Sequence, residues 1–343
     1  MGVVKLGDVA RESRLKWTKS KQDVPIVGLE HLIPNEIRFD VYDINTDNTF
    51  SKRFVKGQVL FGRRRAYQRK AAVAEFDGIC SGDITVIEAI EGKIVPELLP
   101  FIVQTPVFFD YANRGSAGSL SPRVKWEHLA DFEFELPPLE EQKVLADKLW
   151  AAYRLKEAYK KLLDATDEMV KSQFIKMFGG LCQDTPWSDV VTITNGKAYP
   201  EEYQEEGAYP ICGSGGIMCY GEKKLCNGNT TILGRKGNIN NPIFMESGYW
   251  IVDTAFSIDV DKAKLHPKFF YYWCCQYDFT KLNKQGILPS LTRKDLEKVK
   301  MAIPQMRDQL KFVSIAEQAD KSKFELKQCI DNIDKVIKSL ING

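Results

Sequence analysis

Apolar side chains recur at alternating spacings of three and four residues along two long stretches of the chain, 139–178 and 305–342, which contain no glycine or proline. This spacing puts the apolar residues on one face of an α-helix and repeats every seven residues, as in a coiled coil. It predicts one helix over 139–178 and a second over 305–343. The seam of the second helix consists of Phe312, Ala316, Ala319, Lys323, Leu326, Ile330, Ile333, Ile337 and Leu340, and that of the first of Leu145, Leu149, Ala152, Lys156, Tyr159, Leu163, Thr166, Val170 and Gln173.

The two seams share one register, because even the lysine that interrupts them falls at the same place, Lys156 in the first helix and Lys323 in the second. Two long helices with a common heptad register can bury both seams by running antiparallel. We therefore expect an antiparallel coiled coil. The alternative is that each seam packs on its own module, as in an ordinary amphipathic helix.

The chain also contains an internal repeat. Residues 136–142 (LPPLEEQ) return as 303–309 (IPQMRDQ) at an offset of 167. The earlier correspondences are 61–63 with 233–235 at an offset of 172, and Ile87 with Ile258, Pro96 with Pro267, Gly115 with Gly286 and 119–121 with 290–292 at 171. One four-residue length difference before Leu129 and Leu296 accounts for the drop to 167. An ordered series of this kind favours a tandem copy over shared strand and turn patterns.

The repeat predicts four parts: a first module over 1–138, a helix over 139–178, a second module over 179–304 and a helix over 305–343. Segments 84–87 and 256–260 are short and rich in β-branched residues, which predicts strands and mixed α/β modules in an α+β chain. The first helix would separate the modules by its own length, about 55 Å at about 1.5 Å per residue. The second helix would run back along it, giving pseudo-twofold symmetry.

The composition is that of an ordinary globular protein, with 343 residues, 44% of them hydrophobic and 27% charged. Because no apolar run is long enough for a bilayer span and the first residues lack a secretory signal, we expect a cytoplasmic protein. The 48 Lys and Arg against 46 Asp and Glu give a net charge of +2. The chain lacks the overall basic field of many nucleic-acid binders, so contact with DNA would depend on local clusters.

No pattern in the sequence predicts a metal, a cofactor or an active site. The eight cysteines lack a close Cys-x-x-Cys pair and are accompanied by only three histidines, so we expect reduced thiols and no structural zinc. Phosphate-loop, zinc-protease and nucleophile-elbow motifs are absent. Asp83 with Glu91 and Lys93 weakly resembles a metal-dependent nuclease pattern, but acid and lysine at that spacing are common on surface hairpins.

Two loops at equivalent positions of the repeat carry side chains suited to DNA. The first contains Arg63, Arg64, Arg65, Tyr67, Arg69 and Lys70, and the second contains Arg235, Lys236, Asn238 and Asn240. Arg and Lys pair with guanine edges or phosphates, and Asn pairs with adenine. One such loop would be interpreted more simply as a solvated turn. Two loops at equivalent places favour two DNA-reading surfaces, and their differences predict two target sequences.

A glycine-containing loop near the end of each module supplies further candidates for DNA contact. These are Arg114, Ser116 and Ser119 in the first module, and Gln285, Ser290, Arg293 and Lys294 in the second. Small hydroxyl donors and backbone amides in such loops can hold phosphates. A tight turn before the last strand explains the glycines equally well.

The order of module, helix, module and helix resembles the DNA-specificity subunit of type I restriction-modification systems. The resemblance rests on LPPLEEQ at 136–142, QFIKMFG at 173–179 and GRKGNI at 234–239, and it covers essentially the whole chain. It implies a non-catalytic protein without a cofactor. Two target recognition domains would each read one half of a split, asymmetric DNA site.

The resemblance also implies partners. The paired helices would act as a ruler and dock two adenine methyltransferase subunits, to which ATP-dependent restriction subunits can be added. Trp150, Tyr153 and Phe324 are candidate docking residues, although packing against the modules explains them equally well. Two alternatives stay open: a coiled-coil adaptor with two protein-binding modules, and the specificity component of a combined restriction and modification enzyme with a different partner stoichiometry.

Overall fold

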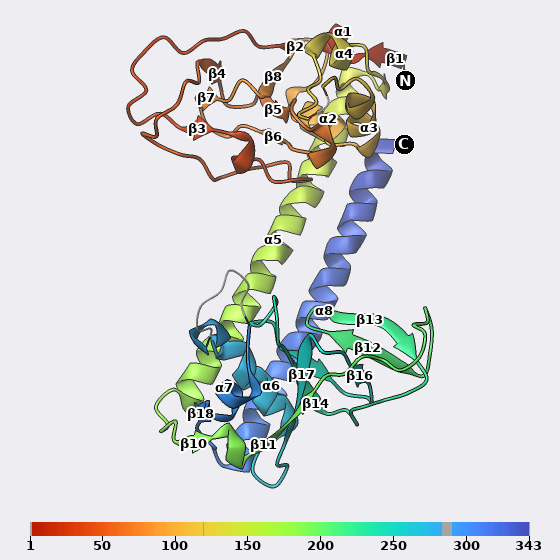
Figure 1. Cartoon of the computed structure of the whole chain (residues 1–343). Helices are drawn as coiled ribbons and strands as arrows, with labels where there is room; N and C mark the ends of the chain where they lie inside the picture. The colour runs from red at the N-terminus through yellow and green to blue at the C-terminus, as the bar shows by residue number, and fades with distance from the viewer. Residues whose placement is uncertain (1, 119, 283–289, 343) are drawn as a thin grey trace. The chain divides into compact units, whose positions relative to one another are not determined.

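The computed structural model describes residues 2–118, 120–282 and 290–342. The chain forms two compact units, one made of Met1–Ala158 and Cys329–Gly343 and the other of Tyr159–Gln328. The two long helices, α5 (Leu139–Phe178) and α8 (Met306–Asn342), each contribute residues to both units (Figure 1). No helix among the described residues is long and apolar enough to cross a membrane.

Short strands and helices precede α5 in the first unit. The strands are β1 (Gly2–Lys5), β2 (Ala10–Glu12), β3 (Ile26–Val27), β4 (Lys52–Phe54), β5 (Val59–Gly62), β6 (Ala71–Val73), β7 (Gly78–Cys80), β8 (Ile84–Ala89) and β9 (Glu133–Leu136). The helices are α1 (Leu6–Val9), α2 (Leu99–Val103), α3 (Pro106–Arg114) and α4 (Trp126–Ala130), with the 3-10 turns η1 (Leu29–His31), η2 (Ala66–Gln68) and η3 (Pro96–Leu98).

The main sheet of the first unit has four strands in the order β2-β8-β5-β6, and every neighbouring pair is antiparallel. A smaller sheet has the order β3-β7-β4, and β1 pairs with β9. Strand β5 is buried along its length because both of its faces are covered: Val59 and Phe61 lie in one core cluster and Leu60 in another. Phe61 lies against Phe108 and Phe109 of α3, with ring centroids 5.6 and 5.8 Å apart. The first basic loop leaves the sheet directly after this contact, at Gly62.

The second unit contains a similar set of elements. Its strands are β10 (Thr185–Pro186), β11 (Val191–Asn195), β12 (Tyr209–Gly213), β13 (Gly216–Gly221), β14 (Thr230–Gly234), β15 (Ile243–Met245), β16 (Trp250–Ile251), β17 (Ala255–Val260) and β18 (Lys300–Met301). Its helices are α6 (Pro267–Gln276) and α7 (Arg293–Glu297), with the 3-10 turns η4 (Trp187–Asp189) and η5 (Phe279–Leu282).

The sheets confirm the internal repeat and the α+β fold class. The main sheet of the second unit has the order β11-β17-β14-β15, in which the strands take the same places as in β2-β8-β5-β6, and β10 pairs with β18 as β1 pairs with β9. The small sheets differ, because the central strand is β7 in the first unit and β12 in the second, where the order is β13-β12-β16. The predicted strands at 84–87 and 256–260 lie within β8 and β17.

The structure corrects one part of the repeat. Arg64 pairs with Arg123 as Lys236 pairs with Ser290, so the offset is already 167 at Arg123. Leu291, which is 2% exposed, corresponds to the buried Val124, whereas Leu120 is 89% exposed. The expected alignment of 119–121 with 290–292 is therefore wrong, since it would place an exposed leucine where the second unit needs a core residue. Ser119 itself lies outside the described residues.

The long helices pair in an antiparallel manner within each unit. In the first unit Lys156 of α5 binds Asp334 of α8 at 2.7 Å, and the C-terminal residues of α8 pack on the core that contains Leu149. In the second unit Lys323 binds Asp167 at 2.9 Å, and Phe174 contacts Phe312 with ring centroids 5.2 Å apart. The lysine that interrupts each seam is thus paired with an aspartate of the other helix. The same helix segments also join the module cores, so both expected modes of packing contribute.

A buried glutamine at the start of each long helix attaches the helix to its module. Gln142 accepts a hydrogen bond from the amide of Val95 at 2.8 Å and donates to the carbonyl of Pro137 at 2.8 Å. Gln309 accepts from the amide of His266 at 2.8 Å and donates to the carbonyls of Lys264 and Pro304 at 2.9 and 2.8 Å. The glutamine common to LPPLEEQ and IPQMRDQ therefore satisfies backbone groups that would otherwise be buried without partners.

We expect Gln309→Ala to lower the free energy of unfolding by about 1–3 kcal/mol, because it leaves buried backbone groups unsatisfied. Urea denaturation of the full chain measures this loss. Gln305→Ala is the control, since Gln305 is exposed in the same turn and its substitution should change stability by less than about 0.5 kcal/mol. Equal losses in the two variants would contradict this role of Gln309.

Candidate nucleic-acid interface

The first basic loop leaves β5 at Gly62 and is held by its backbone. The amide of Arg63 donates to the carbonyl of Asp83 at 2.9 Å, and the amide of Val124 donates to the carbonyl of Arg63 at 3.0 Å. Arg65 and Arg69 bracket η2 with φ values of 55° and 54°, the left-handed conformation that is uncommon outside glycine. The hydrogen bond between Val124 and Arg63 brings the basic loop beside the segment that follows the first glycine loop.

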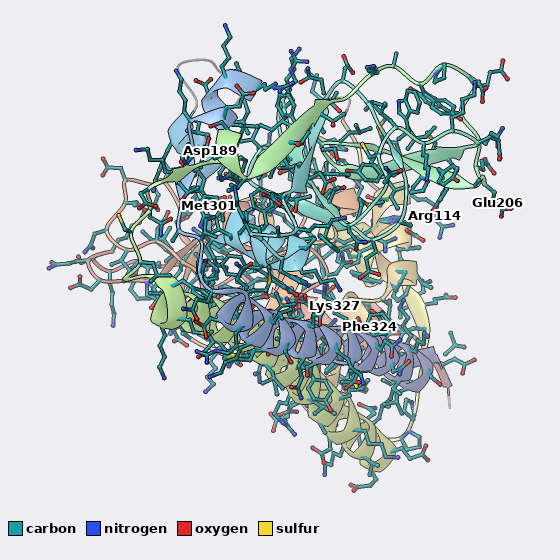
Figure 2. All side chains as sticks on the ribbon, turned by 90° about the horizontal axis from the view of Figure 1, so that it is seen from below. Arg114, Asp189, Glu206, Met301, Phe324 and Lys327 are labelled. Atoms are coloured by element: carbon teal, nitrogen blue, oxygen red, sulfur yellow. The ribbon has the colours of Figure 1, made fainter. Side chains whose placement is uncertain are left out.

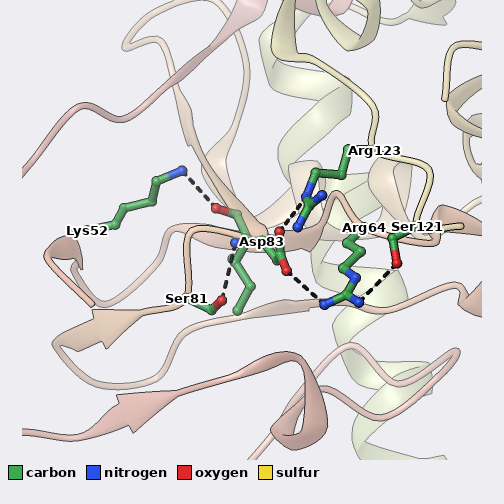
Figure 3. A network of polar contacts seen from close by, with 7 residues as sticks. Lys52, Arg64, Ser81, Asp83, Ser121 and Arg123 are labelled. Atoms are coloured by element: carbon green, nitrogen blue, oxygen red, sulfur yellow. Dashed lines mark hydrogen bonds and ion pairs between the residues drawn. The ribbon is translucent and has the colours of Figure 1, made fainter. Parts of the chain in front are cut away.

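Asp83 forms ion pairs with two arginines where the basic loop meets this segment. Arg123 donates from Nε to Oδ1 of Asp83 at 2.7 Å, and Arg64 donates from Nη1 to Oδ2 at 3.3 Å (Figure 3). Arg64 also donates from Nη2 to the hydroxyl of Ser121 at 3.0 Å. The carboxylate of Asp83 thus orients two guanidinium groups, which explains this acid without the nuclease pattern.

The electrostatics of Asp83 follow from these contacts. Burial opposes ionisation of its carboxyl group, but the hydrogen bonds and charges of Arg123 and Arg64 outweigh that effect and lower the pKa of Asp83 below its ordinary value. The carboxylate is therefore ionised at neutral pH. Among the described residues no group of three or more His, Cys, Asp or Glu is arranged to hold a metal ion.

The other side chains of the first loop have mixed surroundings. Lys70 donates from Nζ to the carbonyl of Leu29 at 2.7 Å, and Arg69 lies 3.5 Å from Asp110. Tyr67 is exposed, and Arg63 is half-buried. Tyr67 is thus available to a ligand without rearrangement, whereas Lys70 and Arg69 already have protein partners.

The surface beside Asp83 is hollowed into a cleft of about 570 Å³. Its lining includes Arg14, Lys16 and Lys52, cations that sequence reasoning did not single out. Lys52 is engaged with the carbonyl of Ile84 at 2.8 Å, while Arg14 and Lys16 are exposed. The signal was present in the sequence, because residues 11–21 contain five Lys and Arg around Trp17.

The loop after β14 occupies the equivalent place in the second unit. The amide of Arg235 donates to the carbonyl of Thr254 at 2.8 Å, and the amide of Leu291 donates to the carbonyl of Arg235 at 2.9 Å. Lys236 and Asn238 are exposed, and the guanidinium of Arg235 lies 5.8 Å from the ring centroid of Phe256. This loop is therefore anchored as the first loop is, but it presents different side chains.

Asn240 has a structural part in the second loop. Its amide group donates to Asp278 at 3.0 Å, and its carbonyl oxygen accepts from the amide of Phe279 at 2.7 Å. These bonds tie the loop to η5. Both ends of its amide group are thus engaged within the protein, and one donor and one acceptor position are left with which Asn240 could read adenine as the sequence predicts.

The candidates in the glycine loops are placed differently in the two units. Ser116 donates its hydroxyl hydrogen to the carbonyl of Ala112 at 3.1 Å, and the exposed Arg114 lies close to the carbonyl of Asp110 at 3.4 Å. Ser290 pairs with Lys236, which brings it to the second loop. Two of the candidates lie on α7: Arg293, which binds Glu297 at 2.7 Å, and Lys294, which is exposed. Ser119 and Gln285 lie outside the described residues.

Two of the three expected docking residues pack against the first module. Trp150 donates to the carbonyl of Glu97 at 2.9 Å and lies under the guanidinium of Arg38, 4.9 Å from the ring centroid, while Tyr153 is buried. Packing against the first module, the alternative offered by the sequence, therefore holds for both residues. Tyr153 is too buried to dock a partner, whereas Trp150 is half-buried. Phe324 of α8 is 62% exposed and stays a candidate (Figure 2).

Comparison with known proteins decides the family. The model of the family described as type I restriction modification DNA specificity domain matches residues 1–165 and 183–334. The chain belongs to this family. Both copies of the repeat fall within the matched ranges, so the resemblance of its sequence to this specificity family is confirmed.

Sequence identity to an individual specificity subunit is low. The type I restriction enzyme EcoDI specificity subunit of Escherichia coli is 26% identical over 174 residues, and the match covers 47% of this chain and 38% of that protein. The chain thus matches less than half the length of that relative.

Solved structures support the fold. The S subunit of a type I restriction-modification system from M. genitalium has a TM-score of 0.65 at 12% identity, with 99% of this chain and 94% of that chain covered. A second structure, from work on complex assembly and conformational transition of the type I R-M system, has a TM-score of 0.58 at 17% identity, with 99% and 96% covered. At such low identity these likenesses bear on the fold alone.

Proposed function

We propose that the chain is the non-catalytic DNA specificity subunit of a type I restriction-modification system, and that each module reads one half of a split, asymmetric site. The observation that carries the proposal is the pair of loops after β5 and β14. Equivalent backbone hydrogen bonds hold them, yet their side chains differ, as two readers of different sequences require. Membership of a DNA specificity family supplies the class of ligand.

We further propose that two adenine methyltransferase subunits dock on this chain, and that ATP-dependent restriction subunits join them. The net charge of +2 supports the proposal that partner subunits contribute to DNA binding, because a single chain with so small a net charge attracts the phosphate backbone weakly. The exposed Phe324 on α8 offers an apolar contact for such a subunit. On this proposal the partners supply part of the affinity and this chain supplies the sequence preference.

The direct experiment is to map methylated adenines in DNA from cells that carry this chain together with its methyltransferase. We expect methylation at one split motif with two specified halves and an unspecified spacer. Methylation without sequence preference, or at an undivided site, would overturn the proposal. Binding to duplex DNA should also fall steeply as salt rises, since cations in the loops would release counterions from phosphates.

Arg235→Ala should weaken or relax recognition of one half-site by about 1–3 kcal/mol and leave the other half unchanged. The reason is that Arg235 belongs to the loop of the second module alone. Binding of the full complex to duplexes altered in either half measures the effect. Lys262→Ala removes an exposed cation elsewhere in the same module and is the control. A uniform loss over both halves would contradict modular reading.

Removing one heptad from each long helix, residues 159–165 and 326–332, should shorten the spacer between the half-sites. Seven residues correspond to about 10 Å of helix, or about three base pairs. The methylated motif in cells that carry the shortened chain reports the spacer. Removing the heptad from one helix alone is the matched control, since helices of unequal length cannot keep both the Lys156–Asp334 and the Lys323–Asp167 ion pair. An unchanged spacer in the doubly shortened chain would contradict the proposal that the paired helices set the distance between the half-sites.

A further inference from the structure

The internal repeat allows two readers to be compared within one chain. Arg64 lies opposite Arg123 in an antiparallel bridge in the first unit, as Lys236 lies opposite Ser290 in the second, and the neighbouring residues make the backbone hydrogen bonds. The carbonyl that anchors the loop belongs to Asp83 in the first unit and to Thr254 in the second. Because the backbone contacts are the same while the side chains differ, the side chains at these positions can vary between the units without changing those contacts. They are free to carry specificity.

Arg123 is the side chain that this comparison singles out in the first unit. Its hydrogen bond to Asp83 runs through Nε at 2.7 Å, so Nη1 and Nη2 stay available to a ligand. The side chain is 47% exposed, whereas that of Asp83 is 20% exposed. A guanidinium held through Nε on a shielded carboxylate is oriented before binding, which reduces the conformational entropy lost when a ligand binds.

We propose that Arg123 is a base-reading residue of the first module, that it reads guanine through its two Nη groups, and that Asp83 is its positioning residue. The inference rests on the proposed function and deepens it. The two terminal nitrogens of an arginine match O6 and N7 of guanine in the major groove. Arg64, bound to Asp83 and Ser121, restrains the other side of the same carboxylate.

A base contact fits this geometry better than a phosphate contact. Arg64, Arg123 and Asp83 together carry a net charge of +1, so the carboxylate weakens attraction to phosphate while it fixes direction. The equivalent of Arg123 in the second module is Ser290, which is uncharged. A general phosphate clamp would be needed in both modules, whereas a base reader is expected to differ between them.

The test uses cells that carry the full chain with its methyltransferase, and it compares the methylated motifs of the wild type, Arg123→Ala, Arg123→Lys and Asp83→Asn. The first module's half-site is the half that Arg235→Ala leaves unchanged. We expect that half to contain a guanine, and we expect all three variants to lose the preference for it by about 5- to 150-fold. Other positions should keep their preferences. Asp131→Asn, which breaks the exposed ion pair of Lys5 with Asp131, is the control and should leave the motif unchanged.

Binding of the purified complex separates a base contact from a phosphate contact. Arg123→Lys keeps the charge, so a phosphate contact would survive in it. The guanine contact would be weakened, because lysine has neither the paired Nη groups nor the Nε donor through which Asp83 orients the side chain. A first half-site without guanine, an unchanged motif in Arg123→Ala, or an equal loss of affinity for all sequences with a shallower salt dependence would each overturn the inference. If the wild type methylates without any motif, the proposed function fails and takes this inference with it. If the wild-type motif is split but insensitive to Arg123, this inference alone fails. Thermal melting of each variant checks that it is folded.

Discussion

The need to bury the seams of α5 and α8 governs the architecture of both units. Each unit includes segments of both helices, so each seam is buried partly by the other helix and partly by a module. In the first unit, Leu149 belongs to the module core and Ile337 packs against it, while in the second Phe174 and Phe312 share one aromatic cluster. The lysines within the seams are tolerated because Asp334 and Asp167 pair with them. In each unit the module and its helix segments are thus parts of one folded core, and the loops after β5 and β14 extend from these cores.

The repeat separates the scaffold from its chemistry. Backbone hydrogen bonds, a buried glutamine and a central sheet recur in both units, and none of them depends on the identity of an exposed side chain. The positions between these fixed points carry the differences. Arg64, Arg123 and Asp83 form a charged network where the second unit has Lys236, Ser290 and Thr254. A duplicated fold of this kind can change what one module recognises without disturbing the other.

On the proposed function, the orientation of charge in the first module matters more than its amount. Several cations of the basic loop and its surroundings already have protein partners, as Lys70 has at Leu29 and Arg123 at Asp83. Such engagement reduces the attraction between the loop and any polyanion, but it limits the directions in which a guanidinium can point. Since specificity depends on discriminating one base edge from another, restricted direction is the more useful property. The small net charge of the chain is consistent with the same emphasis.

The sequence by itself determined the features that recur at regular intervals. Heptad spacing predicted both long helices, the matched motifs revealed the repeat, and the loops after β5 and β14 stood out by their charge. These signals are local, because helical periodicity and repeated segments lie along the chain. Only the tertiary structure decided which side chains meet. It moved the register near Leu120, packed Trp150 and Tyr153 against the module, and joined Arg123 to Asp83 across 40 residues. Such contacts depend on how strands and turns are folded together, and no spacing in the sequence encodes them.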